Sequence, residues 1–90
     1  MRLLIVRTQN RERIIPSNDF RVSARTDNTY SVDAVNQNGG TSSVGTYSTH
    51  EKAMKVMDMI QWHFDEGVFE APLDDEVEEL YNSCDALFNY

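Results

Sequence analysis

The sequence predicts a small α+β fold: an antiparallel sheet of four or five strands packed on one long helix, followed by a shorter acidic helix. Two segments, 20–26 and 30–35, alternate apolar and polar residues with the period of a strand. The segment 48–67 instead repeats apolar residues at helical spacing. The clear strand patterns precede this helix, and no strand–helix–strand alternation indicates a parallel sheet.

The length of 90 residues predicts one domain. We divide it into a sheet over 1–47, the main helix over 48–67, and an extended segment plus acidic helix over 68–90. The single cysteine, Cys84, permits no intrachain disulfide, and the aliphatic run 3–6 is too short for a signal peptide or a membrane span. These features predict a cytoplasmic protein without a membrane partner.

The first strand is expected over residues 2–7, where both alternating sets of side chains are apolar. This pattern is typical of an interior strand that is covered on both faces. Residues 13–15 are expected to form its partner and to end at Pro16, which cannot donate to a sheet.

The next two strands are expected to form a hairpin with a three-residue turn at 27–29. This odd turn places Ala24 opposite Val32, and Val22 opposite Ala34. A two-residue turn would pair apolar with polar side chains. The side-chain alternation therefore favours the odd turn.

A weaker strand over 41–47 follows a glycine-rich turn at 36–40 and leads into the main helix. Ser48 and Glu51 have the spacing of a capping box at the helix start, and Gly67 provides a left-handed stop. The expected core combines residues of the hairpin and the helix: Phe20, Val22, Ala24, Val32, Ala34, Val56, Ile60 and Phe64.

A second helix is expected after Pro72, beginning at Asp75 and Glu78, which again have the spacing of a capping box. Its apolar residues share one face: Val77, Leu80, Tyr81, Cys84 and Phe88. Its first turns are crowded with acidic residues, which the positive end of a helix favours: Asp74, Asp75, Glu76, Glu78 and Glu79.

Charge is distributed unevenly. Residues 1–48 hold six arginines and four acidic residues, a net charge of +2, whereas residues 49–90 hold two lysines and eleven acidic residues, a net charge of −9. Because phosphate contacts need a basic surface, this distribution argues against direct nucleic-acid binding. It is compatible with a partner that has a basic surface, or with a role in solubility alone.

No arrangement of residues indicates catalysis, a cofactor or a metal. The two histidines, His50 and His63, lack a third convergent ligand, and Cys84 falls on an apolar stripe. The glycine pair at 39–40 lacks a phosphate-loop lysine. We therefore predict a protein that is not an enzyme.

Trp62 points away from the apolar stripe of the main helix, and Met59 lies one turn before it. Two interpretations remain open. The second helix folds back and covers this pair, with Tyr81 on its apolar face, or Trp62 and Met59 are exposed anchors for an intermolecular contact.

Several segments resemble a group of small uncharacterised proteins from phages, prophages and mobile elements of Gram-positive bacteria. They are Thr-Gln-Asn at 8–10, Gly-Thr-Tyr-Ser at 45–48 leading into the helix 51–60, and Val-Phe-Glu-Ala-Pro at 68–72. The resemblance spans about residues 2–77. It implies a phage-type origin, a host bacterial cytoplasm and an α+β fold, and it carries over no active site.

Three functions compete. The first is a phage accessory protein that inhibits a bacterial defence effector, such as a CRISPR nuclease, through an acidic surface that mimics nucleic acid. Its predicted contact residues are Asp74, Asp75, Glu76, Glu78, Glu79, Trp62, Met59 and Tyr81. The second is a homodimeric structural or regulatory module. The third is a binder of a small nucleotide signal through Arg21 and Arg25, which is disfavoured because Asp33 is a ready partner for these arginines.

Overall fold

The computed structural model describes residues 3–36 and 38–88 of the chain. Within these residues, six strands, two α-helices and a short 3₁₀-helix follow one another in the order β1 (Leu4–Arg7), β2 (Ile14–Ser17), β3 (Phe20–Ala24), β4 (Tyr30–Val35), β5 (Thr41–Tyr47), α1 (His50–His63), β6 (Val68–Glu70), η1 (Asp74–Glu76) and α2 (Val77–Phe88). The α+β class is therefore confirmed. Arg2 of the expected first strand, Gln37 of the glycine-rich turn, and residues 89–90 of the last segment lie outside the described residues.

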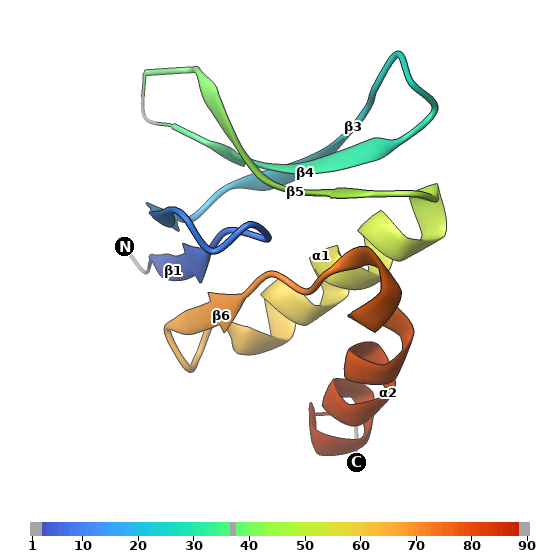
Figure 1. Cartoon of the computed structure of the whole chain (residues 1–90). Helices are drawn as coiled ribbons and strands as arrows, with labels where there is room; N and C mark the ends of the chain where they lie inside the picture. Colours follow the sequence, from blue (N-terminus) through green and yellow to red (C-terminus); the bar gives the residue numbers. More distant parts are fainter. Residues whose placement is uncertain (1–2, 37, 89–90) are drawn as a thin grey trace.

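The strands form two sheets of three strands each, in place of the single sheet that was expected (Figure 1). One sheet has the order β3-β4-β5, and the other has the order β2-β1-β6. The helix α1 packs against the first sheet and also contacts β6 and α2. The expectation of purely antiparallel pairing was wrong, because β6 runs parallel to β1 and adds a strand after the helix.

In the hairpin of β3 and β4, Val22 lies opposite Val32, and Ala24 lies opposite Tyr30. The predicted pairs of Ala24 with Val32 and of Val22 with Ala34 were therefore wrong, although apolar residues do face one another across the hairpin. The cause is the position of the turn: the Arg25 amide donates to the Thr29 carbonyl, so the three-residue turn lies at 26–28, with Asn28 at a φ of +66°, and not at 27–29.

The strand β1 is the centre of its sheet, as expected of an interior strand, but only one of its faces is covered. Leu4 and Val6 are fully buried, whereas Ile5 on the opposite face is 43% exposed. The expectation of coverage on both faces was wrong, because the second face belongs to an open groove.

The helix α1 is capped by Thr49, whose hydroxyl accepts from the Lys52 amide at 3.1 Å. The predicted capping box of Ser48 and Glu51 is thus wrong by one residue, because Ser48 is bound elsewhere, to Asp74. The helix ends at His63, earlier than the predicted stop, although Gly67 has the expected left-handed conformation, with a φ of +82°, and its amide donates to the His63 carbonyl.

The core contains half of the predicted set in fully buried positions: Val32, Ala34, Val56 and Ile60. Phe20, Val22 and Phe64 are half-buried and pack against it. Ala24 is exposed, contrary to expectation, because it sits in the last pair of the hairpin before the turn.

The helix α2 folds back onto α1 with the predicted apolar face. Val77 and Cys84 are buried on this face, and Leu80 is half-buried. Its start differs from the prediction, because a 3₁₀ turn precedes it and the Glu76 carboxylate accepts from the Leu73 amide at 3.0 Å. No helix among the described residues is long and apolar enough to cross a membrane.

Candidate functional site

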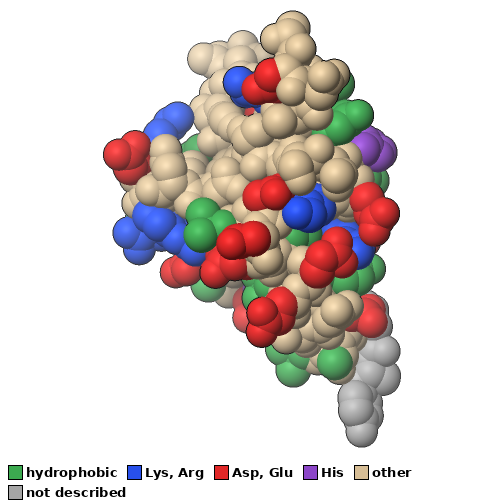
Figure 2. Space-filling model, turned by 45° about the vertical axis from the view of Figure 1, so that its right-hand side comes forward, with side chains coloured by type: hydrophobic (Ala, Val, Ile, Leu, Met, Phe, Trp, Pro, Cys, Tyr) green, Lys and Arg blue, Asp and Glu red, His purple; other side chains and the backbone are tan. Residues whose placement is uncertain are grey.

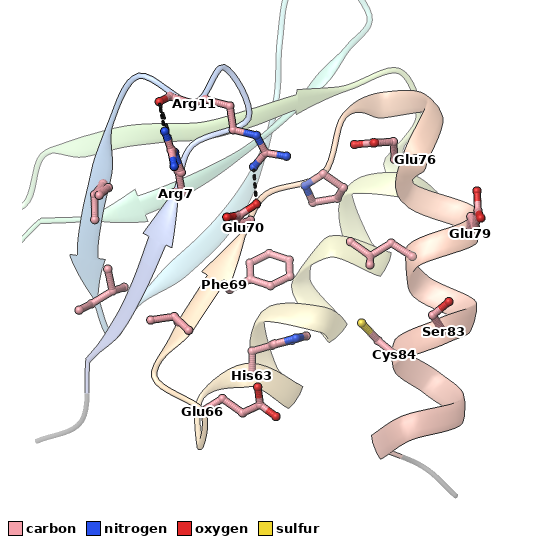
Figure 3. A pocket seen from close by; sticks show the side chains of 15 residues that line it. Arg7, Arg11, His63, Glu66, Phe69, Glu70, Glu76, Glu79, Ser83 and Cys84 are labelled. Atoms are coloured by element: carbon pink, nitrogen blue, oxygen red, sulfur yellow. Dashed lines mark hydrogen bonds and ion pairs between the residues drawn. The ribbon is translucent and has the colours of Figure 1, made fainter.

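A groove of about 850 Å³ lies between the β2-β1-β6 sheet and α2 (Figure 3). Figure 3 shows Phe69 and His63 between β6 and α2, with Cys84 pointing toward them from α2. The groove extends onto the uncovered face of the sheet, where Ile14 is 65% exposed and Val68 is 58% exposed. It therefore combines an apolar floor with access from solvent.

The charges that line the groove are mostly negative. Its ionised side chains are Arg7, Arg11, Glu66, Glu70, Glu76 and Glu79. Arg11 pairs with Glu70 at 3.5 Å, and the Arg7 guanidinium donates to the Arg11 carbonyl. The two arginines are thus held at one end, while carboxylates on and near α2 leave a net negative wall.

Asp74 fastens the start of α1 to the 3₁₀ turn. One of its oxygens accepts from the Ser48 amide at 2.7 Å, and the other accepts from the Ser48 hydroxyl at 3.0 Å and from Lys52 Nζ at 3.1 Å. Burial favours the neutral acid, but these hydrogen bonds outweigh it and lower the pKa of Asp74 below its usual range. The first of the predicted contact residues is therefore engaged within the fold.

Glu78 is engaged as well. Its carboxylate accepts from Lys55 Nζ, which also contacts Glu51 at 3.2 Å and lies 5.2 Å from the centre of the Tyr81 ring. The hydrogen bond with Glu78 is the main reason that the pKa of Lys55 is raised. Glu78 and Tyr81 thus tie α2 to α1.

Asp75 and Glu79 are different, because no hydrogen bond or ion pair engages either side chain within residues 3–36 and 38–88. Both are exposed, as is Glu76 beside them. Figure 2 shows acidic side chains gathered over the part of the surface that carries the helices. Of the five predicted acidic residues, Asp75, Glu76 and Glu79 present charge to solvent most directly.

Of the two interpretations left open for Trp62 and Met59, the exposed pair is wrong for Met59, which is fully buried. Trp62 is half-buried, and its ring lies 5.4 Å from that of Tyr81 and 6.3 Å from that of Phe88. The second helix therefore covers Trp62, which is the internal interpretation of the two that the sequence left open.

His63 and Cys84 come close to the groove without forming a metal-binding group. His63 Nδ1 donates to the Met59 carbonyl at 2.8 Å, and the centre of the His63 ring lies 4.9 Å from that of Phe69 and 5.1 Å from that of Phe88, tilted against both. Burial raises the pKa of the Cys84 thiol, and the nearby charge of Glu66 adds to this effect. No cluster of three or more potential metal ligands occurs among the residues that the structure describes.

The two arginines proposed for a nucleotide signal lie on β3 and in the turn after it. Arg21 lies opposite Asp33 in the sheet, and Arg25 pairs with Asp27 at 3.8 Å. The structure does not bring them together with the residues of the groove.

The groove itself was not predicted from the sequence. It depends on the pairing of β6 with β1, two segments that are more than 60 residues apart in the chain. The available signal was that both faces of the first strand are apolar. Ile5 on the second face was expected to be covered, but no element was assigned to cover it.

Comparisons with known proteins add no evidence about function to these geometric observations. No family model matches the chain, and neither a curated protein nor a solved structure is significantly similar to it.

Proposed function

We propose that this protein acts without catalysis, by binding a basic surface of a bacterial protein through the acidic residues of η1 and α2. The observation that carries the proposal is the exposed, unneutralised position of Asp75 on η1 and of Glu79 on α2, two elements that are themselves held against α1. Asp74 and Glu78 hold these elements against α1, so the backbone positions that carry the outer carboxylates are set before a partner arrives. Preorganised charges lose little conformational entropy on binding.

The resemblance to phage proteins makes a host defence effector the first class of target, with a CRISPR nuclease as the leading example. Such effectors bind nucleic acid through basic grooves, and carboxylates spaced along a helix can occupy positions that phosphates would take. Opposite charge would also accelerate the encounter between the two proteins.

The test compares two variants with the same change in net charge. The first carries Asp75→Lys on η1 and Glu79→Lys on α2, and the second carries Glu12→Lys and Asp19→Lys, both exposed, in the loops before and after β2. The structural acids Asp74 and Glu78 remain untouched in both, so the fold should survive.

Each protein is produced in bacteria that carry one of a panel of defence systems, and infection by a targeted phage is measured. The proposal expects the natural chain and the second variant to restore infection against at least one system. The first variant should bind the purified effector at least about tenfold more weakly and should fail to restore infection. Restoration by both variants, or no binding to any effector of the panel, contradicts the proposal.

A further inference from the structure

The proposed function uses the acidic residues of η1 and α2 but leaves one feature of the groove without a role: the open edge of β6. The strand ends the order β2-β1-β6, and no described strand pairs with its other side. Its pairing with β1 is bounded by two hydrogen bonds, from the Ile5 amide to the Gly67 carbonyl at 2.9 Å and from the Ala71 amide to the Arg7 carbonyl at 3.0 Å.

These two bonds determine which peptide groups face the groove. Along a strand, successive residues direct their amide and carbonyl groups to opposite sides. With Gly67 and Ala71 bonded to β1, Phe69 also faces β1, and the main chains of Val68 and Glu70 face outward. Within the described chain, no group from outside the sheet forms a hydrogen bond with either of them.

We propose that an extended, basic segment of the partner protein binds in this groove as a fourth strand beside β6, between β6 and α2. This inference rests on the proposed function and adds the way in which the partner is held. Addition of a strand to a free sheet edge is a common mode of peptide recognition, in which main-chain hydrogen bonds give affinity and adjoining pockets give specificity.

The walls of the groove specify the chemistry of that segment. Side chains that point inward would meet the apolar surface around Phe69, Leu80 and Cys84. Lysine or arginine side chains would reach Glu79 on α2 and Glu66 after α1, neither of which has a cationic partner among the described residues. A segment in which apolar residues alternate with basic ones would therefore match both the apolar surface and the carboxylates of the groove.

A second copy of this chain fits the groove less well. Each copy carries a net charge of −7, and edge-to-edge pairing would bring two acidic α2 helices toward each other. The partner segment is therefore assigned to another protein with the opposite charge.

The experiment selects binders of the full chain from a displayed library of random seven-residue peptides. The strongest binder is then synthesised, and its Kd is measured by fluorescence anisotropy. We expect the selected peptides to be enriched in lysine or arginine alternating with apolar residues. Peptide binding should shift the amide NMR signals of Val68 and Glu70 most strongly.

A pair of substitutions isolates the main-chain contact. Glu70→Pro removes an outward amide without removing a β1–β6 bond, and proline is tolerated at such edge positions. Glu70→Ala is the matched control, because it also loses the ion pair with Arg11 but keeps the amide. We expect Glu70→Pro to weaken binding about fivefold or more and Glu70→Ala to weaken it less than twofold.

If Glu70→Pro does not fold, a peptide with alternate N-methylated amides provides the same test on the natural chain, and its binding should weaken equally. The inference is overturned if no peptide is selected, if the shifts map elsewhere, or if neither the proline nor the N-methyl groups change the Kd. A dimer that Glu70→Pro dissociates would also overturn it.

The two proposals fail separately. An effector that loses affinity for the Asp75→Lys, Glu79→Lys variant but not for Glu70→Pro refutes strand addition alone. The reverse pattern refutes the acidic contact and leaves β6 as the binding element.

Discussion

The Pro72 carbonyl oxygen is the point at which three distant segments of the chain meet. It accepts from the Tyr47 hydroxyl at 2.9 Å and from Gln9 Nε2 at 3.2 Å. Gln9 also accepts from the Thr46 amide and donates to the Thr46 carbonyl, both at 3.0 Å. These side chains join β5, the β1–β2 loop and the segment that leads into η1. They thereby fix the end of the groove that Pro72 lines.

Removal of the Tyr47 hydroxyl should therefore destabilise the fold. Tyr47→Phe is expected to lower the free energy of unfolding by about 1–2 kcal/mol, because a buried hydrogen bond is lost. Urea denaturation measures the change, and Tyr30→Phe is the control, since Tyr30 is only half-buried. Equal stability of the two variants would show that the Pro72 contact contributes little.

Gly45 is required by close packing beside the same tyrosine. A Cβ atom at this position would lie 2.9 Å from Tyr47 Oη and 3.1 Å from Gln9 Cβ. Gly45→Ala should cost about 1–3 kcal/mol, as overpacked substitutions do. In a Tyr47→Phe background the cost should be smaller, because one crowded atom is absent, and denaturation of the four proteins measures this coupling. Strict additivity would contradict the packing explanation.

Asp74 should make the free energy of unfolding depend on pH in the acidic range. Its pKa is lowered in the folded state, so its contribution is complete above the unfolded value of about 3.9 and is lost as the pH falls through the folded value. Asp74→Asn should therefore be less stable than the natural chain at pH 7, and the difference should shrink below about pH 4. Thermal melts across this range test the prediction, and a difference that is constant with pH would contradict it.

At the scale of the element, α2 is stabilised by its contact with α1 and by the side chains that join the two helices. Val77, the first residue of α2, is fully buried and belongs to the hydrophobic core. Val77→Ala should cost about 2 kcal/mol and should shift Trp62 fluorescence toward the red, because loosening of α2 exposes the indole. Unchanged emission at equal helix content would mean that Trp62 is covered by something other than α2.

The elements that were predicted well are those with a strong local pattern. The alternation of β3 and β4 and the apolar stripe of α1 are properties of the sequence alone, and all three elements formed within the expected ranges, β3 and α1 being shorter than expected. The start of α1 was misplaced because Ser48, a good capping residue, is bound by Asp74, which is 26 positions away. The strand β6 was described only as extended, since three residues carry too little periodicity to reveal a parallel partner.

In the candidate site, too, features with a local pattern were predictable and features that depend on distant contacts were not. The acidic residues were visible in the sequence, but their roles were not, because only the packing of α2 on α1 separates Asp74 and Glu78 from Asp75 and Glu79. Trp62 was identified as unusual from its position on the helix. The sequence left open whether α2 or another molecule covers it, and the contacts of Trp62 with Tyr81 and Phe88 identify α2.

At the scale of the whole molecule, the charge of the second half is the property on which the proposed binding depends. A fixed array of carboxylates attracts a basic partner at long range, and this attraction is screened by salt. The Debye length falls from about 14 Å near 50 mM salt to about 6 Å near 300 mM, which is shorter than the extent of the helix surface.

The most direct test is the affinity for the effector identified by restored infection, measured by calorimetry at about 50 and about 300 mM salt. The natural chain and the Glu12→Lys, Asp19→Lys control should bind at least about tenfold more weakly at the higher concentration. The Asp75→Lys, Glu79→Lys variant should bind weakly at both. An affinity that neither salt nor this charge reversal changes would contradict the claim that the acidic helix binds the partner.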